Sequence, residues 1–127
     1  MFYDSGITSV TFPSSLTSIG RSAFSNCSGL TSISLPSSLT SIGSCAFYYC
    51  EGLTSISLPS SLTSIESYAF EGCSALESVV FPEGSTGWYV TTSLTATSGD
   101  PVDVTNPSTN ASNLTGQYRT YYWKRNV

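Results

Sequence analysis

Residues 30–52 read LTSISLPSSLTSIGSCAFYYCEG, and residues 53–75 repeat this stretch of 23 residues almost letter for letter. A further copy begins at Leu76, and a related copy begins at Ile7. The shared unit is Leu-x-x-Ile-x-Leu-Pro-x-x-Leu-x-x-Ile-x-x-x-Ala-Phe-x-x-Cys-x-x. A fixed period of about 20 to 50 residues is typical of solenoids and other repeat architectures.

Apolar residues and prolines occupy the same positions in successive copies. They include Ile7, Leu30, Leu53 and Leu76; Val10, Ile33, Ile56 and Val79; Phe24, Phe47 and Phe70; Pro13, Pro36, Pro59 and Pro82; and Cys27, Cys50 and Cys73. One copy cannot bury its own apolar face, whereas stacked copies bury Leu on Leu and Phe on Phe as continuous ladders. The repeat therefore predicts a solenoid, and we call each copy a rung.

Each rung begins with a predicted short β-strand. Ile33 and Leu35 point to one side of this strand, and Ser32 and Ser34 point to the other, because side chains alternate along a strand. Pro36 lacks an N–H and ends the strand. Stacked strands lie about 4.8 Å apart, so four rungs predict a narrow, concave parallel sheet about 15 Å wide.

The second half of the rung is predicted to contain a helical turn. Phe47 and Cys50 lie three residues apart, which suits one α-helical or 3₁₀ turn between Ser44 and Cys50. Gly52 is then expected to adopt a positive φ and lead the chain into the next rung.

The unit resembles the BspA-like leucine-rich repeats of bacterial surface proteins over about residues 1–84. The resemblance implies a leucine-rich-repeat solenoid of short parallel β rungs with helical or 3₁₀ turns. It also implies a non-catalytic, extracellular or cell-surface adhesion protein that binds host or bacterial surface proteins or glycans without a cofactor. No ligand follows from the resemblance, and the chain itself shows no signal peptide.

The chain divides into two predicted parts. Residues 1–84 form the solenoid, with a partial rung at 1–6, three full repeats and one truncated repeat, and residues 85–127 form a small C-terminal β cap. Trp88 to Thr92 and Gln117 to Lys124 are predicted to pair as the strands of this cap. A short helix is expected to start near Pro107. The incomplete first rung indicates a fragment or a truncated relative of a longer protein.

The composition excludes several classes of partner. Charged residues make up 9% of the chain, its net charge is −4, and it contains four Lys and Arg residues, so we expect no nucleic acid partner. No apolar run reaches about 18 residues, so we expect no membrane insertion. With no His and scattered acidic residues, the sequence predicts no catalytic site, no metal and no cofactor.

The candidate binding residues are outward-facing hydroxyls and variable aromatic residues. The hydroxyl positions, with one apolar member, are Ser9, Thr11, Ser32, Ser34, Ser55, Ser57, Ser78 and Val80, and the aromatic ones are Tyr48, Tyr49, Tyr68 and Tyr3. The hydroxyls either contact a ligand or only solvate a short strand. The tyrosines either anchor a ligand or pack as ordinary surface residues. Sugar stacking on Trp88 or Trp123 is a further hypothesis.

The cysteine ladder has three alternative interpretations: a buried reduced ladder, a disulfide or a metal site. The absence of His disfavours a zinc site, and free Cys packs as a small apolar residue, so we expect buried, reduced thiols.

Two functions remain open: a recognition or adhesion module that binds protein or glycan, and a structural terminal segment without its own ligand. The N-terminal edge of the solenoid is also predicted to support self-association.

Overall fold

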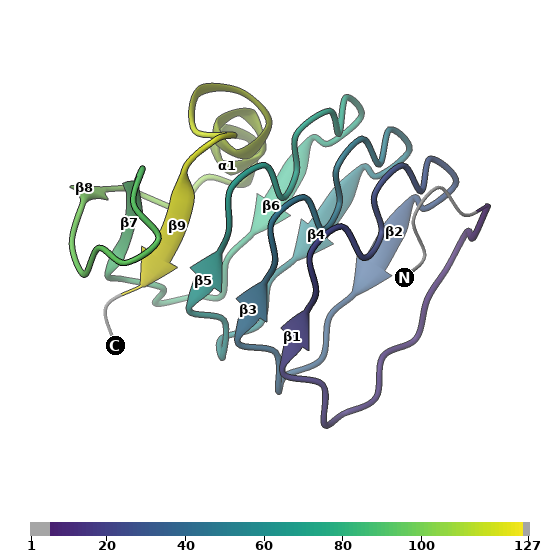
Figure 1. The fold of residues 1–127 in the computed structure, drawn as a ribbon, viewed down its shortest axis with the longest axis horizontal. Helices are drawn as coiled ribbons and strands as arrows, with labels where there is room; N and C mark the ends of the chain where they lie inside the picture. The colour runs from purple at the N-terminus through teal and green to yellow at the C-terminus, as the bar shows by residue number, and fades with distance from the viewer. Residues whose placement is uncertain (1–5, 126–127) are drawn as a thin grey trace.

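A computed structural model describes residues 6–125 of the chain. Its predicted strands form a parallel three-stranded sheet of β2 (Ser32–Ser34), β4 (Ser55–Ser57) and β6 (Ser78–Val80), in that order (Figure 1). Each strand pairs with its equivalent one repeat later, so Ile33 lies beside Ile56 and Ile56 beside Val79. The expected leucine-rich-repeat fold with short parallel strands is confirmed.

A second column of strands was not predicted. It consists of β1 (Ser18–Ile19), β3 (Ser41–Ile42) and β5 (Ser64–Ile65), which pair in parallel register. Its signal was present in the sequence, because the tetrapeptide Leu-Thr-Ser-Ile occurs twice in the rungs that begin at Leu30 and Leu53, for example at 30–33 and again at 39–42. The rungs that begin at Leu30 and Leu53 therefore each contribute one short strand to each of two sheets.

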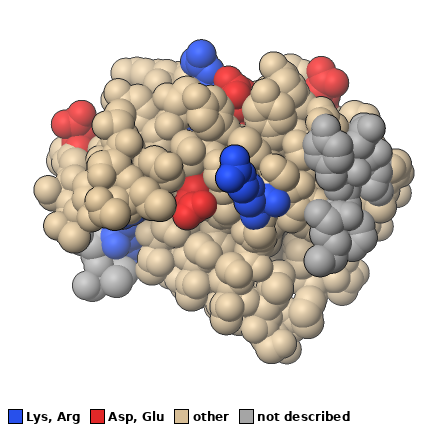
Figure 2. All heavy atoms as spheres, viewed as in Figure 1, with Lys and Arg blue, Asp and Glu red and all other residues tan. Residues whose placement is uncertain are grey.

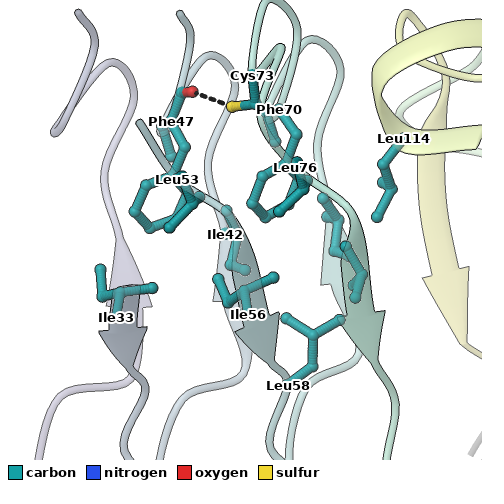
Figure 3. Close-up of a cluster of buried hydrophobic side chains, with 14 of the residues drawn as sticks. Ile33, Ile42, Phe47, Leu53, Ile56, Leu58, Phe70, Cys73, Leu76 and Leu114 are labelled. Carbon is teal, nitrogen blue, oxygen red and sulfur yellow. Dashed lines mark hydrogen bonds between the residues drawn. The ribbon is translucent and has the colours of Figure 1, made fainter. Parts of the chain in front are cut away.

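The core lies between these strands and consists of the predicted ladders. Phe24, Phe47 and Phe70 stack with ring centroids 5.6 and 5.4 Å apart, and their planes are nearly parallel. The isoleucines of both columns point inward beside them (Figure 3). Because each ladder residue packs on its own equivalent in the next rung, the same side chain fits at every level.

The turn segment of the rung is not a helical turn. Hydrogen bonds of the i to i+3 type do occur there, from the Ala46 N–H to Gly43 O and from the Cys50 N–H to Phe47 O. However, Cys45 and Tyr49 have φ values of 58° and 54°, which interrupt a helix after a few residues. The segment is therefore a series of tight turns with left-handed residues at fixed repeat positions.

Gly52 also differs from the expectation, since it is not among the glycines with positive φ. Its lack of a side chain allows the backbones of two rungs to approach closely. A Cβ atom at this position would lie 2.4 Å from the carbonyl oxygen of Ser28 in the preceding rung. Glycine is needed here because the backbones of two rungs come close together.

Within residues 6–125 no disulfide joins the four cysteines, and Cys27, Cys50 and Cys73 are buried, as expected for a ladder of thiols. The Sγ of Cys50 donates to Phe24 O at 3.0 Å. In the next rung the Sγ of Cys73 donates to Phe47 O at 3.0 Å, the bond drawn in Figure 3. Burial raises the pKa of Cys50 to about 11 and that of Cys73 to about 12. These thiols pack between rungs and remain protonated near neutral pH.

The C-terminal residues form β7 (Trp88–Thr91), β8 (Asp100–Pro101), helix α1 (Pro107–Ser112), a π-helical turn η1 (Asn113–Gln117) and β9 (Tyr122–Arg125). The predicted pairing of β7 with β9 is confirmed and is antiparallel. The predicted helix at Pro107 is confirmed too, and the side chain of Asn106 caps its first N–H groups.

The cap is continuous with the solenoid. Strand β9 lies between β5 and β7, so the larger sheet has the order β1-β3-β5-β9-β7-β8 (Figure 1). Helix α1 packs on β6, where the Asn110 Nδ2 donates to Val79 O at 2.9 Å. The Tyr68 N–H of the turn segment donates to Arg119 O. Residues after 85 thus cover the C-terminal end of the solenoid at β5, at β6 and at the turn segment. The boundary between the two parts of the chain stays a prediction.

The first rung lacks the strand that the sequence predicts for it. Residues 6–12 carry no strand, so three rungs rather than four contribute to the β2-β4-β6 sheet in the described part of the chain. Residues 1–5 of the predicted partial rung lie outside the described residues. Val10, Phe12 and Leu16 remain only partly buried at this end.

Candidate recognition surface

The outward side of the three-stranded sheet carries two rows of small side chains. Pairing places Ser32, Ser55 and Ser78 in one row and Ser34, Ser57 and Val80 in the next. We call these six residues the serine face. All are exposed except Ser78, which is half-buried. Ser9 and Thr11 are exposed as well, but they lie in the segment 6–12 and outside the sheet.

Other hydroxyls of the repeat have structural roles. Thr40, Thr54 and Thr63 donate through Oγ1 to the carbonyl oxygens of Thr17, Thr31 and Thr40, each 23 residues earlier. Ser38 and Ser61 likewise bond to Leu16 O and Leu39 O. Among residues 6–125, no such bond is found for the serine hydroxyls of the serine face. These side chains therefore have hydrogen-bonding capacity that the fold does not use.

Shallow grooves adjoin the serine face at the ends of its strands. One has a volume of about 410 Å³ and is lined by residues that include Ser34, Leu35, Ser57 and Leu58. A second, of about 310 Å³, lies one rung earlier and includes Thr11 and Ser34. The grooves recur because each rung places the same strand end and proline turn beside its neighbour.

The predicted tyrosines lie on the turn segments. Tyr48 and Tyr49 contact each other with ring centroids 4.6 Å apart, whereas no ring contact joins Tyr68 to them. The Tyr49 ring lies over Gly72 of the next rung, where an added Cβ would come within 1.7 Å of it. Tyr49 and Tyr68 are exposed, at 42% and 38%. Tyr3 lies outside the described residues.

The hypothesis of sugar stacking on Trp88 or Trp123 is wrong. Trp88 is 4% exposed and Trp123 is 0% exposed, so neither ring face reaches solvent. Both rings contact Phe81, with centroid distances of 5.1 and 6.2 Å. They extend the aromatic core into the cap, because β7 and β9 continue the sheet of the solenoid.

A larger groove was not anticipated from the sequence. It measures about 590 Å³ and lies on the outward side of β5 and β9, beside the loop 92–99. Its polar lining includes Ser64, Glu66, Tyr122 and Lys124. We call it the cap groove. Sequence reasoning missed it because it needs β9 to pair with β5, which lies about 60 residues earlier in the chain.

Charged groups are few and do not gather in one place. Arg119 Nε and Glu71 Oε1 form an ion pair at 3.0 Å on the turn side. Hydrogen bonds from Thr105 lower the pKa of Asp103. Blue and red side chains are scattered over the face seen in Figure 2.

Within residues 6–125, no three His, Cys, Asp or Glu side chains are grouped to hold a metal ion, and no helix is long and apolar enough to cross a membrane.

These features define a leucine-rich-repeat fold whose three-stranded sheet exposes rows of neutral hydroxyls. The family model "BspA type Leucine rich repeat region (6 copies)" matches residues 1–95, and the chain belongs to this family. Such repeat domains are typically non-catalytic, and proteins of the family are generally surface or binding proteins.

The fold is similar to that of a bacterial protein of known structure. The crystal structure of the T. pallidum leucine-rich repeat protein matches with a TM-score of 0.56 and 39% sequence identity. The match covers 59% of this chain and 35% of the T. pallidum chain. The matched part of the present chain thus spans about a third of the length of the T. pallidum chain. A search among curated proteins gives no match.

Proposed function

We propose that this chain is a non-catalytic recognition module of an extracellular or cell-surface protein, and that it binds a protein or glycan through the serine face. The observation that carries the proposal is the contrast between two sets of hydroxyls. Those of Thr40, Thr54 and Thr63 bind the neighbouring rung, whereas those of the serine face are exposed and available to a ligand.

The shape of the surface supports the same role. The rows of Ser55 and Ser57 run across all three strands, and the grooves beside them repeat at the strand ends. A ligand that lies across the strands therefore meets a small hydroxyl at every rung, although Val80 replaces the second serine on β6. Such contacts are individually weak, so affinity depends on how many rungs the ligand spans.

The test is an array of purified matrix proteins and glycans probed with the folded chain. We expect at least one ligand, and we expect Ser55→Arg to weaken its binding about tenfold or more. Ser55 lies on the central strand β4, so an arginine there obstructs the face without entering the core.

Ser74→Arg is the matched control, because Ser74 is equally exposed but lies on a turn. It should bind as the unmodified chain does. Thermal unfolding must show that both variants fold. Failure of the folded chain to bind any array component, or equal binding by Ser55→Arg, would contradict the proposal.

A second candidate function is a structural terminal segment that has no ligand of its own. It is favoured by the closure of the last rung through Asn110, Arg119 and β9. Native-state hydrogen exchange tests it. A true terminus should protect the Tyr68 N–H as strongly as the Cys45 N–H of the preceding rung, whereas an ineffective cap would let Tyr68 exchange much faster.

A further inference from the structure

The floor of the cap groove is built from outward side chains of paired strands. Ser64 of β5 pairs with Lys124 of β9, and Lys124 pairs with Tyr89 of β7. The next residues along β5 and β9, Ile65 and Trp123, point into the core and are almost fully buried. Side chains alternate along a strand, so Tyr122 returns to the outward side and lies in the groove lining together with Glu66.

The wall of the groove is the loop 92–99, which is fastened to the floor. Lys124 Nζ donates to Leu94 O and to Ala96 O, and the Tyr89 hydroxyl donates to Ala96 O at 3.3 Å. Gly99 brings the loop back against β7, where an added Cβ would lie 2.3 Å from Val90 O. These contacts hold the wall in one place, so the groove of about 590 Å³ is a built feature of the fold.

Recognition in this groove must come from side chains. Both β5 and β9 are interior strands of the sheet, and their backbone groups are paired on each side. An extended peptide therefore cannot add to the floor as a further strand. What the floor offers is the half-buried phenol of Tyr122, the hydroxyl of Ser64 and the carboxylate of Glu66.

The hydrogen-bonding groups of the groove favour a ligand rich in hydroxyl groups, because the donors of both cations are engaged by backbone carbonyls. Lys124 is engaged by two loop carbonyls, and Arg125 donates from Nε to Thr86 O at 2.9 Å and from Nη1 to Ser60 O. Glu66 Oε1 accepts the Ser44 N–H at 3.2 Å, which fixes the carboxylate at the groove. A fixed carboxylate accepts hydrogen bonds from ligand hydroxyls.

We propose that the cap groove is a binding site for a neutral saccharide. The C–H surface of a sugar ring packs on Tyr122, and its hydroxyls donate to Glu66 and bond with Ser64 and Thr97. This site is distinct from the serine face, and it does not depend on the function proposed for that face.

The test is a titration of the ¹⁵N-labelled chain with neutral trisaccharides: maltotriose, cellotriose and chitotriose. We expect at least one of them to shift the amide resonances of Ser64, Thr97 and Tyr122 in a saturable way. Tyr122→Ala should weaken binding of that trisaccharide about fivefold, the effect of losing an aromatic contact of about 1 kcal/mol. Tyr122→Phe, which keeps the ring, should retain most of the affinity.

Thr97→Arg provides a variant that does not disturb the core, because Thr97 is an exposed residue of the loop that lines the groove. It should block the trisaccharide, whereas Ser55→Arg should not affect it. Tyr68→Ala serves as the aromatic control, since Tyr68 is exposed on the turn segment and does not line this groove.

Two results would overturn the proposal. One is the absence of saturable shifts with all three trisaccharides. The other is binding that Ser55→Arg abolishes and Thr97→Arg leaves intact, which would place the saccharide on the serine face. Neither result tests whether the serine face binds a protein, which the array measures. The two proposals can therefore fail independently.

Discussion

At the scale of single residues, the threonine and the serine of one tetrapeptide have different roles, which their contacts show. The hydroxyls of Thr40 and Ser55 occur in copies of the same Leu-Thr-Ser-Ile tetrapeptide. The first bonds to a carbonyl of the previous rung, and the second faces solvent. Serine and threonine are therefore abundant here for two reasons: some connect the rungs and others cover the surface.

Gly52→Ala should destabilise the protein, because its Cβ would lie 2.4 Å from Ser28 O, a backbone atom that cannot rotate away. We expect the free energy of unfolding to fall by about 1 to 3 kcal/mol, as for other overpacked sites. Chemical denaturation measures this change. Gly20→Ala is the control, since no atom lies within 4 Å of its added Cβ, and equal effects of both variants would refute the explanation.

The buried thiols predict a loss of stability in alkali. The pKa of Cys50 is about 11 and that of Cys73 about 12 in the folded chain, against 9.0 for an unperturbed thiol. The folded state thus keeps its thiol protons to higher pH than the unfolded state. Stability from this source is complete below pH 9 and declines as the pH rises toward the folded values.

Denaturation at about pH 8 and about pH 10.5 checks this expectation. The unmodified chain should lose more stability between the two conditions than a Cys50→Ala, Cys73→Ala double variant, in which the two thiols cannot ionise. The comparison cancels the contribution of tyrosines and lysines, which both proteins share. Equal losses would show that the buried thiols do not govern the alkaline response.

At the scale of elements, helix α1 closes the edge of the three-stranded sheet. Asn110 is fully buried, and its Nδ2 donates to Val79 O on β6 and to Val104 O. The second of these bonds anchors the chain segment that precedes the helix. A single amide side chain thus donates to one carbonyl of the sheet and to one carbonyl of the segment before the helix.

Asn110→Leu keeps the approximate volume of the side chain and removes both hydrogen bonds. We expect the free energy of unfolding to fall by about 1 to 3 kcal/mol, because two buried carbonyls lose their donor. Ser112→Ala in the same helix is the control, since Ser112 is exposed and should change stability by less than about 0.5 kcal/mol. If the two variants unfold alike, Asn110 does not hold the helix to the sheet.

At the scale of the whole molecule, the two ends of the solenoid differ. The C-terminal end is covered by β9, α1 and Arg119. At the other end, Thr40 donates to Thr17 O, but the Thr17 N–H has no acceptor among residues 6–125. A groove of about 460 Å³ there is lined mainly by apolar side chains, including Val10, Phe12 and Leu16. We propose that two copies associate through this edge.

Sedimentation at increasing concentration should therefore show a dimer, since the closed C-terminal end prevents head-to-tail growth. Thr17→Pro should weaken the dimer, because it removes an edge donor that has no partner in the described residues, as prolines on edge strands do. Leu94→Lys, a change on the exposed loop of the cap, is the control and should leave the dimer intact. A chain that stays monomeric at all concentrations would exclude this association.

Local sequence patterns predict most of the fold. Alternation of Ser32, Ile33 and Ser34 predicts β2 and its equivalents, and the outward direction of the serines follows from it. Stacking of Phe47 on Phe70 follows from the period alone. The residues that were misjudged are those whose conformation depends on a neighbouring rung: Gly52 faces Ser28, and Trp123 enters the core only because β9 joins β5.

The repeat by itself thus determined the leucine-rich-repeat architecture, its ladders and the exposed serine positions, because each rung contacts only rungs that have the same sequence. Only the tertiary structure decided how the non-repetitive residues 85–127 close the last rung and where the cap groove lies. Those contacts join Ser64 to Lys124 and Val79 to Asn110 across long stretches of chain. No periodicity encodes such pairs, since they depend on the side-chain packing and hydrogen bonds that form when the segments meet.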